Sequence, residues 1–189
     1  MKPVLAVLPL LLLAGCASTA STPSTPAASA PGAASVPHVD AATVALAPAS
    51  GSLVSGKLAA MSMDGGVHFI GEIGGLAPGS THGIHVHEKG DCSAADASSA
   101  GGHFNPGGRP HGNPQGHARH AGDLPNITAG SDGVARVDMH VHGITLGGAA
   151  ATDVLQRALV VHAQPDDYAS QPAGNSGARI ACGLIRAGG

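Results

Sequence analysis

Histidine is concentrated in one part of this 189-residue chain, because seven of its 12 histidines lie between His82 and His120. Within the segment GIHVHEKGDC, His85 and His87 are separated by a single valine. Residues i and i+2 of a β-strand project from the same face, so these two imidazoles would point in one direction. Imidazole nitrogen is a common ligand of copper and zinc. The spacing therefore predicts one side of a metal site.

Two downstream segments supply the further donors that a metal site needs. His162 ends the apolar run RALVVH and could be a third imidazole ligand. Two sites can be composed from the available donors. An all-histidine site with three or four imidazoles suits redox-active copper, and a tetrahedral site of histidines plus one carboxylate suits zinc. The second segment, HFNPGGRPHGNPQGHARHAGD, contributes His103, His111, His117, His120 and Asp123.

The other histidines have a simpler interpretation. His82 precedes His85 by three residues, so it would lie on the opposite strand face, and we interpret it as a structural, hydrogen-bonded histidine. His140 and His142 form a second His-x-His pair in MHVHG, without a matching acidic residue or loop histidine. We therefore expect that pair on an exposed strand face rather than at a metal. The remaining histidines are expected on the surface: His38, His68 and His117.

A scaffold must position these donors, and the pattern of the chain is that of short β-strands. Glycine and proline recur throughout, and helix signals are scarce. The turns MDGG and SDGV are typical of hairpins. Several of the intervening runs alternate apolar and polar residues, which predicts an all-β sandwich or barrel. The expected strands are ATVALAP, SGKLAAMSM, GVHFIGEI, GIHVHE, GVARVDMHV, RALVVH and RIACGLI.

Two long segments interrupt this rhythm of strands. Residues 89–124 contain four histidines, and residues 163–178 are polar and end directly before Arg179. Loops longer than about 12–15 residues in a small domain are usually functional or disordered. We therefore expect both segments to be long functional loops that carry or border the metal site.

The N-terminus is typical of an exported protein. One charged residue, Lys2, precedes an apolar run at 4–13, which is shorter than the ~20 residues that span a bilayer. The run is typical of the apolar core of a signal peptide and ends in LAGC at Cys16. LAGC resembles the lipobox of bacterial lipoproteins, whose cysteine is lipidated and becomes the new N-terminus. We predict a lipoprotein signal peptide at residues 1–15 and lipidation of Cys16.

Residues 16–39 are predicted to be a flexible tether, because they are rich in Ala, Ser, Thr and Pro and are nearly without charge. The folded domain is then 40–189. A lipidated Cys16 would place it in the cell envelope, on the periplasmic side. Because no Asp follows Cys16, the outer membrane is favoured over the inner one. The net charge of −3 and the 2% aromatic content argue against a nucleic-acid partner.

Cysteine usage fits an exported protein. If Cys16 carries lipid, Cys92 and Cys182 are the two that remain. Two cysteines in an exported domain favour a disulfide, although sequence alone does not bring them together in space.

Five segments, taken in order, resemble copper–zinc superoxide dismutase of the exported bacterial kind. They are GIHVHEKGDC, GGHFNP, RHAGDLPNI, LVVHAQPDD and GNSGARIACG, and the resemblance covers most of residues 41–185. It implies an eight-stranded antiparallel Greek-key β-barrel, an immunoglobulin-like sandwich with long metal-binding and electrostatic loops. It also implies one copper and one zinc per subunit, with superoxide converted to O₂ and H₂O₂. Such an enzyme would protect the cell envelope from extracytoplasmic superoxide.

The resemblance assigns roles to individual residues. His103 would bridge the two metals as an imidazolate and act in catalysis, with Arg179 beside the copper to attract superoxide. Asp166 would hydrogen-bond ligands of both metals, although its neighbour Asp167 could take that role. Cys92 and Cys182 would form a disulfide. The copper ligands would be His85, His87, His103 and His162, and the zinc ligands would be His103, His111, His120 and Asp123.

Three questions stay open at this stage. The segment YASQPAGNS has no charged residue, unlike the loop that guides substrate in the animal enzymes. Lys57, Lys89 or Arg109 could replace that function. Monomeric and homodimeric members both exist, so a homodimer is one option. A domain that stores or delivers metal, or a structural envelope protein with incidental histidines, would be the alternative functions.

Overall fold

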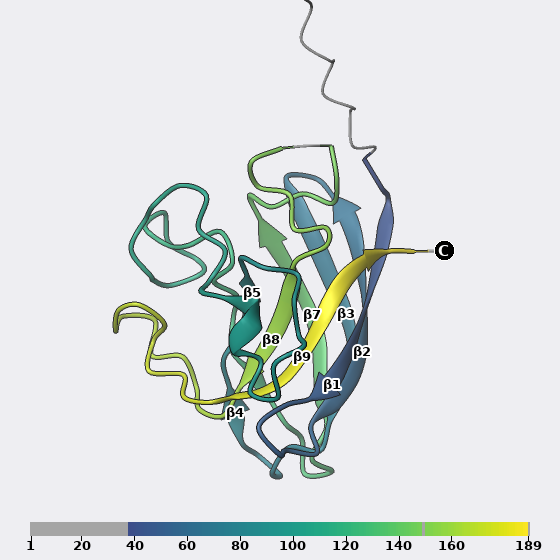
Figure 1. Cartoon of the computed structure of the whole chain (residues 1–189), viewed down its shortest axis with the longest axis vertical. Coiled ribbons are helices and arrows are strands. Elements are labelled where there is room, and N and C mark those ends of the chain that lie inside the picture. Colours follow the sequence, from purple (N-terminus) through teal and green to yellow (C-terminus); the bar gives the residue numbers. More distant parts are fainter. Residues whose placement is uncertain (1–37, 149, 189) are drawn as a thin grey trace, which may run out of the picture. The chain divides into compact units, whose positions relative to one another are not determined.

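Alternating burial along several of the apolar runs places one strand face against a shared interior. In strand β1 (Ala41–Pro48), for example, Ala42, Val44 and Leu46 are buried and the residues between them are exposed. This is the period of two that a half-buried strand requires. The computed structural model describes residues 38–148 and 150–188. The expected runs all form strands, and the all-β prediction is confirmed (Figure 1).

The remaining elements follow in chain order and are mostly long strands joined by tight turns or long loops. One short 3-10 helix, η1 (Ser98–Ala100), lies in the first long loop. The strands after β1 are β2 (Ser55–Met63), β3 (Gly66–Gly74), β4 (Thr81–His82), β5 (Ile84–His87), β6 (Ile127–Thr128), β7 (Ala135–His142), β8 (Ala158–His162) and β9 (Arg179–Ala187).

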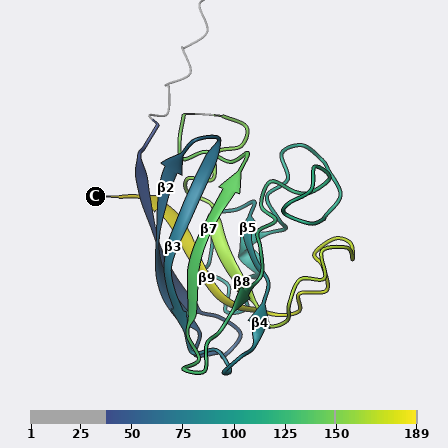
Figure 2. The same cartoon turned by 180° about the vertical axis from the view of Figure 1, so that it is seen from behind.

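Seven strands form one antiparallel sheet in the order β5-β8-β9-β1-β2-β3-β7, and β4 pairs with β6. The sheet is curled, so that β5 and β8 lie on the opposite side from β2 and β3 (Figures 1 and 2). The β4–β6 pair joins its two edges, because β4 continues into β5 after Gly83 and Ala129, which follows β6, bridges to Ala135 of β7. In the described residues there are nine strand segments, and they correspond to the eight expected strands if β4 and β5 count as one.

The curled sheet encloses a single main core. Its largest fully buried side chains include Leu58, Phe69, Ile73, Leu159 and Ile185, which come from the four strands β2, β3, β8 and β9. Burying a side chain of this size contributes about 1.5–3 kcal/mol relative to exposure. The core thus makes a rigid support for the residues that project outward from β5 and β8.

Both expected long loops are present and lie on the same side of the sheet. One runs from β5 to β6, and the other runs from β8 to β9 (Figures 1 and 2). The described residues all belong to one compact unit, and no helix among them is long and apolar enough to cross a membrane. The predicted signal peptide, Cys16 and nearly all of the tether lie outside the described residues.

Candidate metal centre

Strand β5 and the long loop after it bring the donors together. His85 and His87 share one face of β5, while Ile84 and Val86 point into the core. The loop returns alongside β5 and forms two isolated bridges, between His87 and His103 and between His85 and Asp123. Donors far apart in the chain therefore become neighbours through strand-like pairing rather than through sequence proximity.

One donor cluster consists only of histidines: His85, His87, His103 and His162. All four are buried, and one ring nitrogen from each lies within 4.8 Å of the others. The Nε2 atoms of His87 and His162 are 3.3 Å apart. The ring centroids of His85 and His103 are 4.0 Å apart. Such a set of convergent imidazoles suits a copper ion.

The second cluster combines histidines with one carboxylate: His103, His111, His120 and Asp123. The Oδ1 atom of Asp123 lies 2.8, 3.0 and 3.2 Å from the Nδ1 atoms of His103, His111 and His120 respectively. Ligands of a tetrahedral zinc ion with bonds of about 2.0–2.1 Å would be separated by about 3.3 Å. The four donor atoms are thus spaced as zinc ligands are.

Among the described residues of the two clusters, three buried ring nitrogens have no hydrogen-bond partner, and they are the atoms that a pair of metals would engage. They are Nδ1 of His85, Nε2 of His103 and Nδ1 of His111. The last of these is near Asp123 but is not oriented to hydrogen-bond with it. Leaving a buried polar atom unpaired costs about 1–3 kcal/mol, so unpaired nitrogens that converge indicate a missing ligand. The residues fit one copper and one zinc.

In two rings of the all-histidine cluster, the nitrogen that faces away from the cluster donates to a backbone carbonyl. Nδ1 of His87 donates to the carbonyl of Gly101 at 2.9 Å, and Nδ1 of His162 donates to that of Gly177 at 3.3 Å. These partners assign the tautomers and leave Nε2 of both rings free to face a metal. Partners of this kind fix ring orientation and ligand basicity.

Asp166 connects the two clusters. Its Oδ2 accepts from Nε2 of His85 at 2.8 Å, and its Oδ1 accepts from Nε2 of His111 at 2.9 Å. Asp166 is buried, whereas Asp167 is exposed and accepts hydrogen bonds from its own loop. A glycine must pack against this carboxylate, because a Cβ at Gly174 would lie 1.7 Å from Oδ1 of Asp166.

Burial keeps three rings of the all-histidine cluster neutral. Desolvation lowers the pKa of His87 to about 2 and that of His162 to about 4, and it lowers the pKa of His85 well below its usual range. Burial alone would raise the pKa of Asp123. Hydrogen bonds from His103 and from two backbone N–H groups outweigh that effect, so its pKa lies below the usual value. Neutral imidazoles and an ionised carboxylate are the protonation states that bind metals.

A disulfide and an arginine secure the loop beside the histidine cluster. Cys92 and Cys182 form the expected disulfide, which ties the loop to β9. Arg179, at the start of β9, donates from Nη1 to the carbonyl of Ala97 and from Nη2 to that of Gly101, each at 2.6 Å. The Gly101 carbonyl therefore accepts from both Arg179 and His87. Arg179 is thereby positioned next to the ring of His87.

A cleft of about 600 Å³ opens over the clusters, and its lining includes His87, His103, His162 and Arg179. Arg179 is the single lysine or arginine among the described residues that line it. Neither Lys57, Lys89 nor Arg109 reaches this cleft. Arg109 instead donates to the carbonyl of His117 in the loop.

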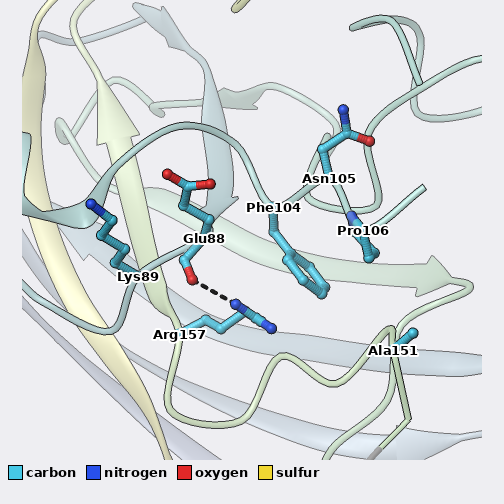
Figure 3. A pocket seen from close by; sticks show the side chains of 7 residues that line it. All are labelled: Glu88, Lys89, Phe104, Asn105, Pro106, Ala151 and Arg157. Atoms are coloured by element: carbon cyan, nitrogen blue, oxygen red, sulfur yellow. Dashed lines mark hydrogen bonds between the residues drawn. The ribbon is translucent and has the colours of Figure 1, made fainter. Parts of the chain in front are cut away.

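A neighbouring pocket of about 420 Å³ is lined by Arg157 and by two residues that follow cluster histidines, Glu88 and Phe104 (Figure 3). The Arg157 guanidinium carbon lies 3.8 Å from the centroid of the Phe104 ring, and Arg157 Nη1 donates to the carbonyl of Glu88 at 2.5 Å. Phe104 follows His103, and Glu88 follows His87. Arg157 therefore contacts the residue directly after His87 and the residue directly after His103.

Several supporting contacts had no signal in the sequence. Gln171 pairs with the backbone of His111 in both directions, at 2.9 Å each way, and so joins the two long loops. The hydroxyl of Tyr168 accepts from the backbone N–H of Asn126 at 2.7 Å. The carbonyls of Gly101 and Gly177 orient the rings of His87 and His162, but residue type does not show which backbone carbonyl will accept a hydrogen bond.

Of the histidines that were not expected to bind metal, His82 and His117 lie as predicted and His140 does not. His82 is buried, and its Nδ1 donates to the carbonyl of His162 at 2.8 Å, so it is a hydrogen-bonded structural histidine. His117 is exposed, as expected. His140 differs from expectation, because it is half-buried and its Nδ1 is buried without a partner.

Comparison with known proteins agrees with this geometry. A family model described as copper/zinc superoxide dismutase matches residues 54–185. The chain is 46% identical over 115 residues to the superoxide dismutase-like protein YojM of Bacillus subtilis, with 58% of each chain covered. It is 43% identical over 138 residues to Cu-Zn superoxide dismutase 2 of Aquifex aeolicus, covering 70% of this chain and 80% of that one.

The fold is also similar to that of solved structures of superoxide dismutase-like proteins. A double mutant of a superoxide dismutase-like protein from Bacillus subtilis superposes with a TM-score of 0.68 at 42% identity, covering 76% of this chain and 96% of that one. Copper and zinc, the metals for which the two donor clusters are suited, are the cofactors of the matched family. The chain therefore belongs to the copper/zinc superoxide dismutase family and is a superoxide dismutase.

Proposed function

We propose that the two donor clusters are the dinuclear catalytic centre and that His103 joins them. Copper would be held by His85, His87, His103 and His162, and zinc by His103, His111, His120 and Asp123. The observation that carries this assignment is the position of His103. Its Nδ1 belongs to the donor set around Asp123, while its unpaired Nε2 belongs to the all-histidine set.

The chain's own residues would divide the reaction between capture, proton transfer and support. Copper, when bound, supplies reversible one-electron exchange, and zinc supplies charge without redox chemistry. Two superoxide anions and two protons yield one O₂ and one H₂O₂. Arg179 would attract each anion into the cleft, where it is the one lysine or arginine among the described lining residues. Nε2 of His103 would take up a proton and return it to the reduced substrate.

Asp166 would support this cycle without touching the substrate. Its two oxygens keep Nε2 of His85 and of His111 protonated, so that Nδ1 of each ring stays directed at its cluster. Because one carboxylate serves both rings, it sets the orientation of both metal sites together. Burial lowers the pKa values of His85 and His87, so these two rings are neutral at neutral pH and each has one nitrogen available for a metal.

The decisive experiment is substitution of the two β5 histidines. His85→Ala/His87→Ala is expected to abolish superoxide decay while zinc is retained, because neither residue belongs to the cluster around Asp123. His117→Ala, at an exposed loop histidine, is the control and should keep both metals and full activity. If the His85/His87 variant still accelerated superoxide decay, the assignment of the catalytic centre would be wrong. A metal-storage domain would instead show a phenotype that tracks metal supply.

We also propose that the protein acts in the cell envelope, anchored by lipid on Cys16 after removal of residues 1–15. The Ala/Ser/Thr/Pro-rich stretch from 16 to 39 would be the tether, and the periplasmic side of the outer membrane would be the location. The disulfide supports this proposal, since disulfides persist in oxidising compartments outside the cytosol. It would protect the envelope from extracytoplasmic superoxide. Mass spectrometry of the mature N-terminus tests the anchor: a diacylglyceryl cysteine at position 16 is expected, and an unmodified Cys16 would refute it.

A further inference from the structure

A second group of metal-binding side chains lies on the outer face of the sheet. Strand register aligns Met61 of β2, His68 of β3 and His140 of β7 in one row across three strands. The next row aligns Met63, Gly66 and His142. We call the five side chains in these rows the methionine–histidine face, which lies on the strands β2, β3 and β7 that face the viewer in Figure 2. None of them belongs to the two catalytic clusters.

The two β7 histidines are placed as a chelating pair. The ring centroids of His140 and His142 are 4.3 Å apart, with the rings nearly perpendicular. Among the described residues, Nδ1 of His140 is buried without a hydrogen-bond partner, so no hydrogen bond at that nitrogen sets the tautomer of the ring. The third imidazole, on His68, is centred 6.3 Å from that of His140 and is engaged by Asp138 at 3.1 Å. Two rings are therefore ready to bind, and a third is within reach of a rotamer change.

The methionines supply the second type of donor. Met61 is 36% exposed and Met63 is 53% exposed, and they are two of the four large apolar side chains that stand out on the surface of the described residues. Met63 lines a pocket of about 370 Å³ together with His140 and Asp64. A thioether is the softest neutral donor among the side chains, and its three rotatable bonds let it adapt. The sulfur of Met63 can therefore turn toward His140.

The choice of metal follows from this donor set. Imidazole alone would accept copper, zinc or nickel, but thioether sulfur selects copper, and Cu(I) in particular. We propose that the methionine–histidine face is an exposed copper site, with His140 and His142 as its principal ligands and Met61 and Met63 completing it for Cu(I). This copper ion would be a third ion per chain, in addition to the copper and the zinc of the catalytic centre.

The site is built for exchange rather than for permanent retention. Among the described residues, three or more His, Cys, Asp or Glu donors converge within 4.8 Å only in the two catalytic clusters. The outer site therefore offers a two-histidine chelate with mobile thioethers, open to solvent. A two-point chelate with rotatable further donors gives up its ion more readily than four buried donors do. Copper would be accepted here and released to a stronger ligand.

The test uses the holoenzyme, loaded with copper and zinc, reduced and kept without oxygen. Titration with Cu(I) against bicinchoninate as the competing chelator should reveal one further equivalent per chain. His140→Ala/His142→Ala should weaken that binding by at least ~10-fold, since changes to residues that merely orient ligands already cost this much. Met61→Leu/Met63→Leu should weaken Cu(I) binding while leaving Cu(II) binding at the pair of histidines.

Superoxide decay and the two catalytic ions should be unchanged in both variants, because these side chains lie outside the cleft. The matched control is Lys57→Ala/Glu72→Ala, a facing pair at the other end of the same sheet face, which should keep the further equivalent. The proposal is overturned if the holoenzyme binds no further copper, if the control loses it as the histidine variant does, or if the histidine variant keeps wild-type affinity.

Discussion

At the scale of single residues, the centre depends on which nitrogen of each ring is already engaged. His85 and His111 use Nε2 for Asp166, whereas His87 and His162 use Nδ1 for backbone carbonyls. The free nitrogen of each ring is consequently directed at its cluster without a competing hydrogen bond. Histidine is thus used in two orientations. The hydrogen-bond acceptor, Asp166 or a backbone carbonyl, determines whether Nδ1 or Nε2 faces the cluster.

Asp166→Asn tests this control of orientation. An amide has one oxygen, so it can accept from His85 or His111 but not from both, and its NH₂ group would face the other donor. We expect metal affinity to fall about 10–100-fold, measured by competition with a chelator. Asp167→Asn is the matched control, because Asp167 is exposed and bonds within its own loop. Equal metal affinity in the two variants would contradict the role of Asp166.

Two substitutions of Arg179 distinguish the effect of its charge from the effect of its hydrogen-bond geometry. Arg179→Lys keeps the positive charge but cannot reproduce two parallel contacts to the carbonyls of Ala97 and Gly101. Arg179→Ala removes the charge and should slow superoxide decay by ~10-fold or more, with the lysine variant in between. The measurement is stopped-flow decay at low and high salt. The salt dependence should be largely lost in the alanine variant, and its persistence would mean that another cation steers the substrate.

At the scale of elements, the sheet is rigid and the loops must be fastened to it. The first long loop is held by the disulfide to β9, by Arg179 at η1 and by Arg157 at Glu88. The second long loop is joined to the first through Gln171 and His111. Each fastening ends within a few residues of a donor, so loop order and metal geometry are coupled.

Cys92→Ser/Cys182→Ser should therefore have two effects. The bridge closes a sequence separation of 90 residues, and its loss should lower the free energy of unfolding by about 4.6 kcal/mol in the chain-entropy model. The segment that carries the Gly101 carbonyl would also loosen, which should reduce activity. Denaturant unfolding of the metal-free protein measures the first effect, and reduced wild-type protein should match the variant. A variant as stable and active as the oxidised protein would contradict both expectations.

At the scale of the whole molecule, the centre buries several neutral imidazoles in a domain that is otherwise a small apolar barrel. His85, His87 and His162 have pKa values below the ordinary 6.5 because burial disfavours the charged ring. The unfolded chain would protonate these rings near pH 6.5, whereas the folded chain would not. Below that pH the unfolded state therefore binds more protons, and acid favours unfolding.

Above about pH 6.5, the three rings should make a constant contribution to the free energy of unfolding of the metal-free protein. This free energy should fall by a few kcal/mol as the pH drops toward 4, where His162 titrates in the folded state. Denaturant unfolding of the metal-free protein between pH 8 and pH 4 measures the loss. Loading with copper and zinc should raise the free energy of unfolding at each pH but keep the fall on acidification, because bound ions keep the folded rings unprotonated while the unfolded chain still takes up protons. Stability that rises on acidification would show that the rings are not neutral in the folded protein.

Much of this structure could be predicted from local pattern. Residue type and spacing identified the strands, the two long loops and the donor residues, because a period of two reports which face of a strand is buried. The His85/His87 pair is a local feature of β5, and it was visible for the same reason. The family resemblance supplied the pairing of Cys92 with Cys182, which the structure confirms.

Other features depend on register between strands that are distant in the chain. The sequence placed His140 and His142 on one face, but only the pairing of β2, β3 and β7 sets two methionines beside them. Likewise, residue type does not distinguish Asp166 from Asp167, and it does not reveal that the Gly101 carbonyl serves both His87 and Arg179. The sequence by itself determined which donors this protein has and which strand faces carry them. The tertiary structure alone decided which ring nitrogens converge, because that depends on contacts closed across the sheet.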